Sequence, residues 1–243
     1  MINKDFQGDI DLTEGEVILI NKPYEWTSFD IVKFVRNNLS KALGLKKIKV
    51  GHAGTLDPLA TGLLIVCVGK QTKNIVKYQG LEKEYTGSFL LGATTPSFDM
   101  ETEVNQTFSI ENISEELIIE TSKKFIGSYQ QYPPIFSAKQ IKGKRAYKYA
   151  RKGQEIEMKS KLVNINQFEI INISFPEIEF KISCSKGTYI RSVVNDFGKA
   201  MDSGAYLSSL CRTKIGSYSL SEALEVDDFK KMLSSNIEAQ QAI

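Results

Sequence analysis

Residues 51–62 combine groups that could do chemistry with residues that bend the backbone. The stretch holds the only histidine of the chain, His52, and a carboxylate, Asp57. Its three glycines permit positive φ and a close approach of the backbone to a ligand, and Pro58 stiffens the turn directly after Asp57. We therefore expect Asp57 to be presented for chemistry, and an ionised carboxylate can act as a nucleophile. An Asp-Pro turn with a capping carboxylate is the structural alternative.

Regular elements on both sides are predicted to hold this loop. Residues 16–20 read as a strand that ends at Pro23. Thr27 and Asp30 have capping-box spacing, and apolar residues at helical intervals then predict an amphipathic helix as far as Gly44. The apolar run of residues 63–68 is too short to cross a bilayer and predicts a buried strand, which anchors the far end of the loop.

The rest of the chain mixes strand and helix patterns without a repeated strand-helix-strand unit. Strands are predicted at residues 84–92, 162–174 and 180–185, and helices at residues 114–125 and from Gly187 onwards. This mixture favours an α+β fold with a mainly antiparallel sheet.

Basic residues gather in two segments of a chain whose net charge is only +2. Residues 31–56 contain six Lys and Arg and no acidic residue, and residues 139–161 contain nine against two glutamates. The remainder is therefore net acidic. Such asymmetry suits one phosphate-binding face on an acidic body. Ordinary solvated surfaces are the alternative.

The segment of about residues 130–161 has two prolines, many charges and little periodicity, which indicates a mobile excursion from the core that could act as a lid. Tyr147 and Tyr149 alternate there with cations that suit contacts to an RNA backbone, namely Lys144, Arg145, Lys148 and Arg151. A solvated helix with its aromatic residues against the core is the alternative.

Several other classes of protein are disfavoured. The N-terminus lacks the pattern of a secretory signal, and Cys67, Cys184 and Cys211 lie too far apart for a zinc site or a disulfide framework, so we expect a cytoplasmic protein. Gly69-Lys70 is followed by Gln71 where a phosphate-binding loop needs Ser or Thr. A serine hydrolase would need His52 as a base near a serine, and we discount this class because the motif around His52 has a different explanation.

Residues 51–64 closely resemble the signature of the TruB family of tRNA pseudouridine synthases. Four further segments resemble motifs of this family in the same order: Asn21-Lys22-Pro23, Glu84-Tyr85, Tyr132-Pro133-Pro134-Ile135-Phe136-Ser137-Ala138 and Cys184-Ser185-Lys186-Gly187-Thr188-Tyr189-Ile190-Arg191. The resemblance implies the pseudouridine synthase fold, with a mixed, mainly antiparallel sheet flanked by helices and a central catalytic cleft. It also implies isomerisation of the uridine at position 55 in the T-loop of tRNA, without a cofactor or metal. The chain length favours the stand-alone bacterial type, and nothing in the sequence indicates more than a monomer.

The resemblance also assigns roles to residues. It makes Asp57 the nucleophile, Arg191 the guanidinium that favours and orients the ionised carboxylate, and Tyr85 the ring that packs on the target base and takes part in transfer of the C5 proton. His52 matches the residue that fills the space left by the extracted base. Lys22 and Tyr189 match pocket-lining residues, and we expect Leu210 to add an apolar wall.

Alternatives to these roles stay open at this point. Arg191 could be a surface helix residue, Tyr85 a core aromatic and His52 a structural histidine. Lys22 could contact a phosphate or lie on the surface before its proline. The sequence does not decide whether Asp57 attacks ribose C1′ or base C6.

The chain also departs from the family pattern. We expect residues 1–220 to form the catalytic domain, with the basic RNA-binding insertion at about 130–161, and residues 221–243 to form a short acidic C-terminal tail instead of the PUA domain common in the family. Cys211 stands where relatives commonly have an arginine. A non-catalytic RNA-binding factor that folds or assembles tRNA with the same cleft is the rival function.

Overall fold

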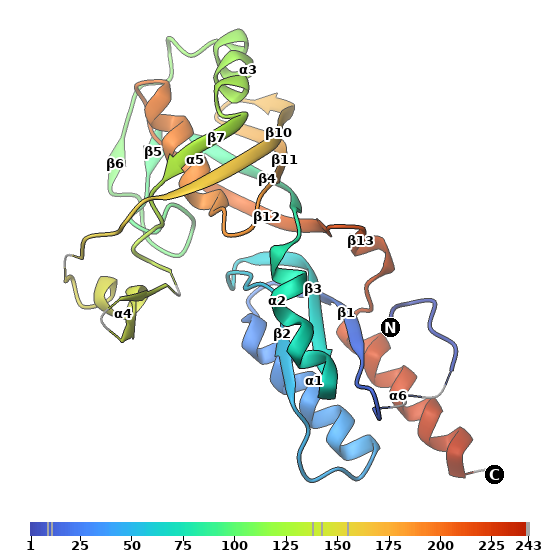
Figure 1. Ribbon diagram of the computed structural model, residues 1–243. Helices are drawn as coiled ribbons and strands as arrows, with labels where there is room; N and C mark the ends of the chain where they lie inside the picture. The colour runs from blue at the N-terminus through green and yellow to red at the C-terminus, as the bar shows by residue number, and fades with distance from the viewer. Residues whose placement is uncertain (9, 11, 138, 142, 155, 242–243) are drawn as a thin grey trace. The chain divides into compact units, whose positions relative to one another are not determined.

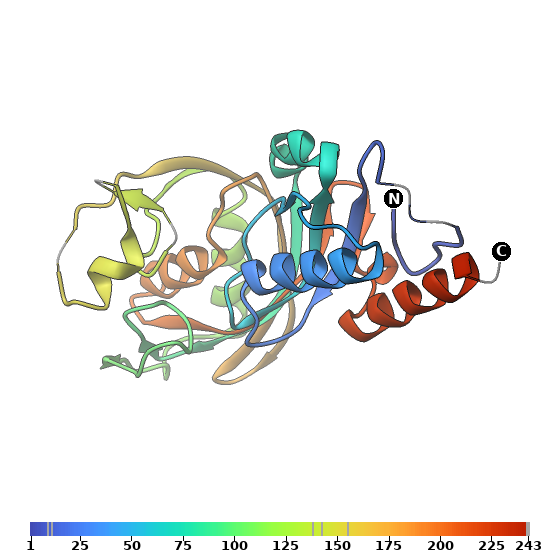
Figure 2. The ribbon, with the colours of Figure 1, turned by 90° about the horizontal axis from the view of Figure 1, so that it is seen from below.

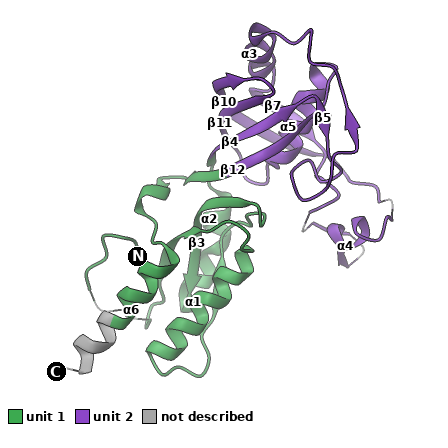
Figure 3. Cartoon of the chain, turned by 180° about the vertical axis from the view of Figure 1, so that it is seen from behind, with its two compact units in different colours: residues 1–84, 211–243 green, residues 85–210 purple. Residues whose placement is uncertain are grey.

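The computed structural model describes residues 1–241 except 9, 11, 138, 142 and 155, with side chains as far as Ser234. The chain forms two compact units, residues 1–84 with 211–243 and residues 85–210, as Figure 3 shows. The chain passes between the units within two strands, β4 (Lys83–Leu91) and β12 (Ala205–Ile215).

The first unit is built around β3 (Ala60–Val68), which pairs antiparallel with both β1 (Val17–Lys22) and β2 (Val50–His52). Successive residues of β1 and β3 point to opposite faces, so each strand contributes to two apolar clusters. Ile18, Ile20, Leu64 and Val66 pack with α1 (Ser28–Ala42) and α6 (Val226–Gln241), which contact each other. The opposite face packs against Tyr78 of α2 (Ile75–Gly80), and Figure 2 shows α2 on the other side of these strands from α1 and α6.

The first unit also contains the shorter elements η1 (Gly69–Asn74), β13 (Tyr218–Ser219) and η2 (Leu220–Glu222), together with the last residues of β12. The final helix α6 completes the core with Phe229 and Leu233, which are buried. Residues 221–241, expected from their charge to be a tail, therefore include a packed helix.

In the second unit the strand order is β12-β4-β11-β10-β7, with β11 at Glu177–Cys184, β10 at Lys161–Ser174 and β7 at Gly127–Gln131. Helices α3 (Glu115–Lys124) and α5 (Ile190–Ala200) cover this sheet, as Figure 1 shows. Five phenylalanines form its aromatic core, namely Phe89, Phe125, Phe168, Phe180 and Phe197. Two small hairpins, β5–β6 (Ala93–Thr94 and Gln106–Thr107) and β8–β9 (Gln140–Ile141 and Lys144–Arg145), and the helix α4 (Ala146–Ala150) lie outside the sheet.

The predicted α+β class and mainly antiparallel pairing are confirmed. The capping box of Thr27 and Asp30 is present at the start of α1, and β3 is buried as expected. Two expectations need correction. The loop of residues 51–62 begins within a short strand, β2, and the segment 130–161 starts in β7 and contains a hairpin and α4.

No helix in the described part of the chain is long and apolar enough to cross a membrane. Cys67, Cys184 and Cys211 form no disulfide with one another, and burial raises the pKa of the Cys67 thiol to about 11.

Candidate functional site

Asp57 lies in the turn that connects β2 with β3. The strands hold the two ends of this turn, because His52 pairs with Val66 and the N–H of Ala53 donates to the carbonyl of Ile65 over 2.9 Å. The N–H of Ala60 donates to the carbonyl of Asp57 over 3.1 Å, which closes the turn. Asp57 itself is half-buried. Its carboxylate is therefore carried by a backbone that is fixed on both sides.

Ser28, the first residue of α1, fixes the residue before Asp57. Its hydroxyl accepts the N–H of Leu56 over 2.8 Å and donates to the carbonyl of Leu56 over 3.2 Å. Ser28 and Leu56 are both buried, so these bonds are shielded from competing water. The capping box places Ser28 by fixing the start of α1.

Lys22, at the end of β1, fixes the residue after Asp57. The lysine is fully buried, and its Nζ donates to the carbonyls of Pro23, Trp26 and Pro58 over 2.9, 2.6 and 3.3 Å. Desolvation lowers the pKa of Lys22 to about 8, while the nearby Asp57 carboxylate acts in the opposite direction. The suggestion that Lys22 is a surface lysine is therefore wrong. A protonated amine has three N–H groups, and here three carbonyls accept them.

Arg212 of β12 is a second buried cation behind this turn, and sequence reasoning did not single it out. Its Nε donates to the carbonyl of Leu63 over 2.8 Å and a terminal nitrogen donates to the carbonyl of Gly54 over 3.2 Å. Gly62 has a φ of +106°, and a Cβ there would lie 2.4 Å from the carbonyl oxygen of Arg212. Only glycine fits at position 62, because both the φ and the close backbone exclude a side chain.

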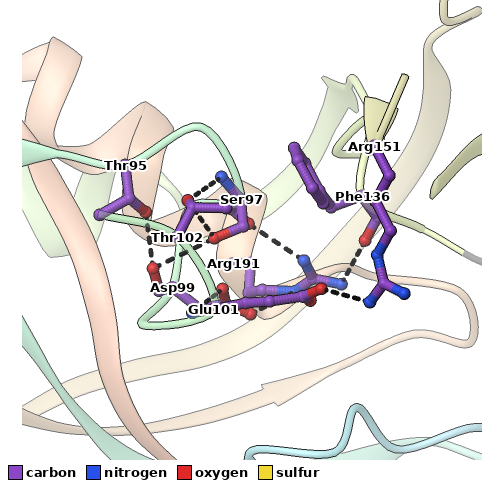
Figure 4. A network of polar contacts seen from close by, with 8 residues as sticks. All are labelled: Thr95, Ser97, Asp99, Glu101, Thr102, Phe136, Arg151 and Arg191. Atoms are coloured by element: carbon purple, nitrogen blue, oxygen red, sulfur yellow. Dashed lines mark hydrogen bonds and ion pairs between the residues drawn. The ribbon is translucent and has the colours of Figure 1, made fainter. Parts of the chain in front are cut away.

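Arg191, in the second unit, is buried at the start of α5 and joins three segments (Figure 4). Its guanidinium donates to the carbonyls of Ser97 and Phe136, both over 3.0 Å, and Nε lies 3.4 Å from a carboxylate oxygen of Asp99. The suggestion that Arg191 is a surface residue is therefore wrong, because only 3% of it is exposed. Asp99 is buried too, and its other oxygen accepts the N–H of Glu101. No motif pointed to Asp99, which lies in an irregular loop.

The motifs of residues 132–137 and 184–191 come together in this unit. Arg191 binds the carbonyl of Phe136, and the hydroxyl of Ser192 donates to the carbonyl of Tyr132 over 2.7 Å. Tyr189 precedes α5, and the side chain of Gln131 bonds both its N–H and its carbonyl over 2.8 and 3.1 Å. The last residue of the first motif, Ala138, lies outside the described residues.

The remaining predicted pocket residues lie on strands. Tyr85 on β4 is 8% exposed, which fits the core reading as well as a pocket wall. Leu210 on β12 and His52 on β2 are half-buried. The structure thus brings Asp57 and Lys22 together in the first unit and places Arg191, Tyr189 and Tyr85 in the second. The pairing of Asp57 with Arg191 stays a prediction.

The four predicted RNA-binding cations are exposed. Lys144 and Arg145 form β9, Lys148 lies in α4, and Arg151 follows α4. Arg151 forms an ion pair with Glu101 over 2.8 Å, as Figure 4 shows. Its guanidinium carbon also lies 5.5 Å from the centroid of the Tyr147 ring. Within the described residues, no group of three or more His, Cys, Asp or Glu could hold a metal ion.

Comparisons with known proteins place these residues in a family context. The family model described as "TruB family pseudouridylate synthase (N terminal domain)" matches residues 41–190. A tRNA pseudouridine synthase B of Flavobacterium johnsoniae is 55% identical over 221 residues, which cover 90% of this chain and 96% of the relative. A protein of the same name from Phocaeicola vulgatus is 50% identical over 220 residues, 90% of this chain and 94% of the relative.

Two solved structures show a shared fold. The archaeal box H/ACA sRNP Nop10-Cbf5 complex contains a chain that is 23% identical with a TM-score of 0.65, over 91% of this chain and 54% of that one. A Cbf5-Nop10-Gar1 complex gives 24% identity and a TM-score of 0.67, over 95% and 60%. At this identity the likeness shows the fold alone, and the chain spans just over half the length of those proteins.

Proposed function

Because this chain belongs to the TruB family of pseudouridylate synthases, we propose that it isomerises the uridine at position 55 in the T-loop of tRNA. It is an isomerase that converts uridine to pseudouridine in tRNA. The observation that carries this conclusion is the 55% identity to a tRNA pseudouridine synthase B over 90% of the chain. The catalytic domain comprises residues 1–220, with the RNA-binding insertion at about 130–161, and extends to helix α6, because α6 completes the core of the first unit.

Asp57 is the nucleophile of the proposed reaction. The bond between ribose C1′ and N1 of uracil breaks, the base turns, and a bond forms between C1′ and C5. A base removes the C5 proton, N1 takes up a proton and the Asp57 carboxylate is released, so product and substrate are isomers. The carboxylate attacks either C1′ or C6. The fixed backbone around Asp57 supports this role, because a nucleophile contributes most when its geometry is set before the reaction.

The other site residues orient the carboxylate or the base. Arg191 orients the Asp57 carboxylate, and its burial supports a guanidinium that is held in one position. Tyr85 packs on the base and takes part in the C5 proton transfer, while Tyr189 and Leu210 line the pocket. His52 fills the space that the extracted uridine leaves in the T-loop. The ammonium of Lys22 donates to the carbonyl of Pro58, the residue after Asp57, and so helps to fix the backbone of the site.

The T-arm of tRNA is the proposed partner, bound by the basic excursion with Lys144, Arg145, Lys148 and Arg151 as phosphate contacts. The enzyme acts as a monomer in the cytoplasm, where tRNA is modified. The isomerisation has no redox step, and we propose that it proceeds without a cofactor or metal.

The experiment is site-resolved mapping of pseudouridine in an unmodified tRNA transcript after incubation with the purified protein. Conversion confined to the T-loop uridine is expected. A transcript with cytidine at that position should stay free of pseudouridine, which controls for conversion elsewhere. Conversion at another uridine would overturn the position, and a protein that binds the transcript but converts no uridine would support the rival tRNA-folding factor.

A further inference from the structure

One face of α1 is exposed along its whole length and carries an aromatic ring followed by cations. Phe29, Lys33, Asn37 and Lys41 recur every four residues, so they lie on one side of the helix, and all four are exposed. We call these four residues the α1 stripe. Lys46, Lys47 and Lys49, also exposed, continue its positive charge into the loop after the helix. The proposed mechanism makes no use of this face.

The aromatic end of the α1 stripe directly follows Ser28, which fixes the residue before Asp57. Ser28, the residue before Phe29, bonds both backbone groups of Leu56, which precedes Asp57. On the other side of the turn, the N–H of Glu25 donates to the carbonyl of Pro58 over 2.9 Å, and the residue before Glu25 is the exposed Tyr24. Phe29 therefore follows the residue that bonds Leu56, and Tyr24 precedes the residue that bonds Pro58. The two exposed rings are sequence neighbours of the residues that fix the backbone on each side of Asp57.

These rings are exposed although apolar partners are close by in the chain. Tyr24 is 53% exposed and Phe29 is 54% exposed, whereas Trp26 and Phe34 pack against the core with ring centroids 5.8 Å apart. The Lys33 ammonium lies 5.0 Å from the centroid of the Phe29 ring, which is a cation–π contact, so a positive charge and an exposed ring lie next to each other. Neighbouring rings and ammonium groups are the combination that binds unpaired bases and their phosphates.

Charge on the helix supports an anionic ligand. The only acidic residue of α1 is Asp30, whose carboxylate is engaged by the hydroxyl and the N–H of Thr27. Arg36, which is not in the stripe, is held by the carbonyl of Val50 over 3.3 Å. Glu25, which directly follows Tyr24, is an exposed acidic residue near the aromatic end of the stripe. Away from that end, the α1 stripe presents ammonium groups without acidic neighbours on its helix.

We propose that Tyr24 and the α1 stripe form a second RNA-binding surface, in which the rings stack on unpaired bases next to the target uridine and Lys33 and Lys41 bind phosphates leading away from it. The inference deepens the proposed function, because it assumes that a tRNA loop is presented to Asp57. It adds a contact on the first unit to the one already proposed for the basic excursion of the second unit.

Binding of an unmodified tRNA transcript at several salt concentrations tests the cations. The protein is used with Asp57→Asn, so that the RNA is not converted during the measurement. For Lys33→Gln with Lys41→Gln we expect the slope of log affinity against log salt to become shallower by about 1.4–1.8, the value for two phosphate contacts. Lys123→Gln with Lys124→Gln, an equal loss of charge at exposed positions of α3, is the matched control and should leave the slope unchanged.

The rings are tested in the same assay. Tyr24→Ala with Phe29→Ala should weaken binding about tenfold or more, as loss of base stacking requires, with an unchanged salt slope. Phe29→Tyr keeps a ring and should bind as the parent does. All these positions are exposed, and equal thermal unfolding of the variants checks that the fold is kept.

The inference is overturned if both double variants bind the transcript within twofold of the parent with an unchanged slope. It is also overturned if the stripe variants keep RNA binding but lose binding to polyglutamate, which would assign the surface to an acidic protein. A failure of the proposed function is distinguishable from either result. In that case the protein with Asp57 intact would convert no uridine, while RNA binding would still depend on the stripe.

Discussion

The hydroxyl of Ser28 bonds both the N–H and the carbonyl of Leu56, which couples the first residue of α1 to the residue before Asp57. With Lys22 on the carbonyl of Pro58, side chains from two elements fix the backbone on each side of the proposed nucleophile. Because Ser28 and Lys22 fix the backbone that carries Asp57, we expect changes at these residues to alter the reaction rate through the position of the carboxylate.

Ser28→Ala should lower kcat about tenfold while changing KM less. The change leaves both buried backbone groups of Leu56 without their side-chain partner, at a cost of about 1–3 kcal/mol. Single-turnover conversion of the transcript gives the rate, and urea unfolding gives the stability. Ser40→Ala on the same helix is the control. A normal rate in a destabilised Ser28→Ala protein would show that the contact between Ser28 and Leu56 stabilises the fold without affecting catalysis.

Gly62→Ala should destabilise the protein more than Gly44→Ala. Both glycines have positive φ, +106° and +63°, but a Cβ at Gly44 meets no atom within 4 Å. We therefore expect about 1–2 kcal/mol at Gly44 from the backbone conformation alone. The close approach to Arg212 should add about 1–3 kcal/mol at Gly62. If denaturant unfolding gives equal losses of stability for the two variants, the backbone of β12 moves away from a Cβ at position 62 without an energetic cost.

The buried Lys22 should make stability rise with pH in a defined window. Its pKa of about 8 in the folded protein lies below the ordinary 10.5, so the unfolded chain binds more protons between these two values. The free energy of unfolding of wild type relative to Lys22→Met should therefore rise between pH 8 and 10.5, by about 3 kcal/mol at most. Below pH 8 the difference should be flat. A difference that falls or stays constant through the window would contradict the burial of a protonated Lys22.

Neutralising Lys144, Arg145, Lys148 and Arg151 together should weaken binding of tRNA and flatten its dependence on salt. Arg151 should contribute least, because Glu101 already pairs with it. A protein with Lys123, Lys124, Lys230 and Lys231 changed to Gln carries the same charge loss at exposed positions. If both sets weaken binding equally, only the overall charge matters and the excursion is not an RNA contact.

The sequence predicted α1 and β3 well, because their signals are local. Thr27 and Asp30 set the helix start, and the run of residues 63–68 is apolar on both faces as a buried strand requires. The family signature singled out Asp57 and Arg191 in the same way, from short motifs. The pseudouridine synthase fold that the resemblance implied is confirmed by the solved structures.

Features that depend on distant segments could not be predicted. Helix α6 was interpreted from its acidic residues, but Phe229 and Leu233 find their partners on α1 and β1, some 200 positions away in the chain. The burial of Lys22 and Arg212 runs against the usual exposure of cations, and the carbonyls that accept their N–H groups come from other strands and turns. Asp99 carries no local signal, since only the fold brings it to Arg191.

The most direct test of Asp57 as the nucleophile compares Asp57→Asn with wild type on one unmodified tRNA transcript. Asparagine keeps the size of the side chain but lacks the charged nucleophile. We predict that Asp57→Asn abolishes conversion of the T-loop uridine while it binds the transcript as tightly as wild type. Conversion by Asp57→Asn at the wild-type rate would contradict the role of Asp57 as the nucleophile.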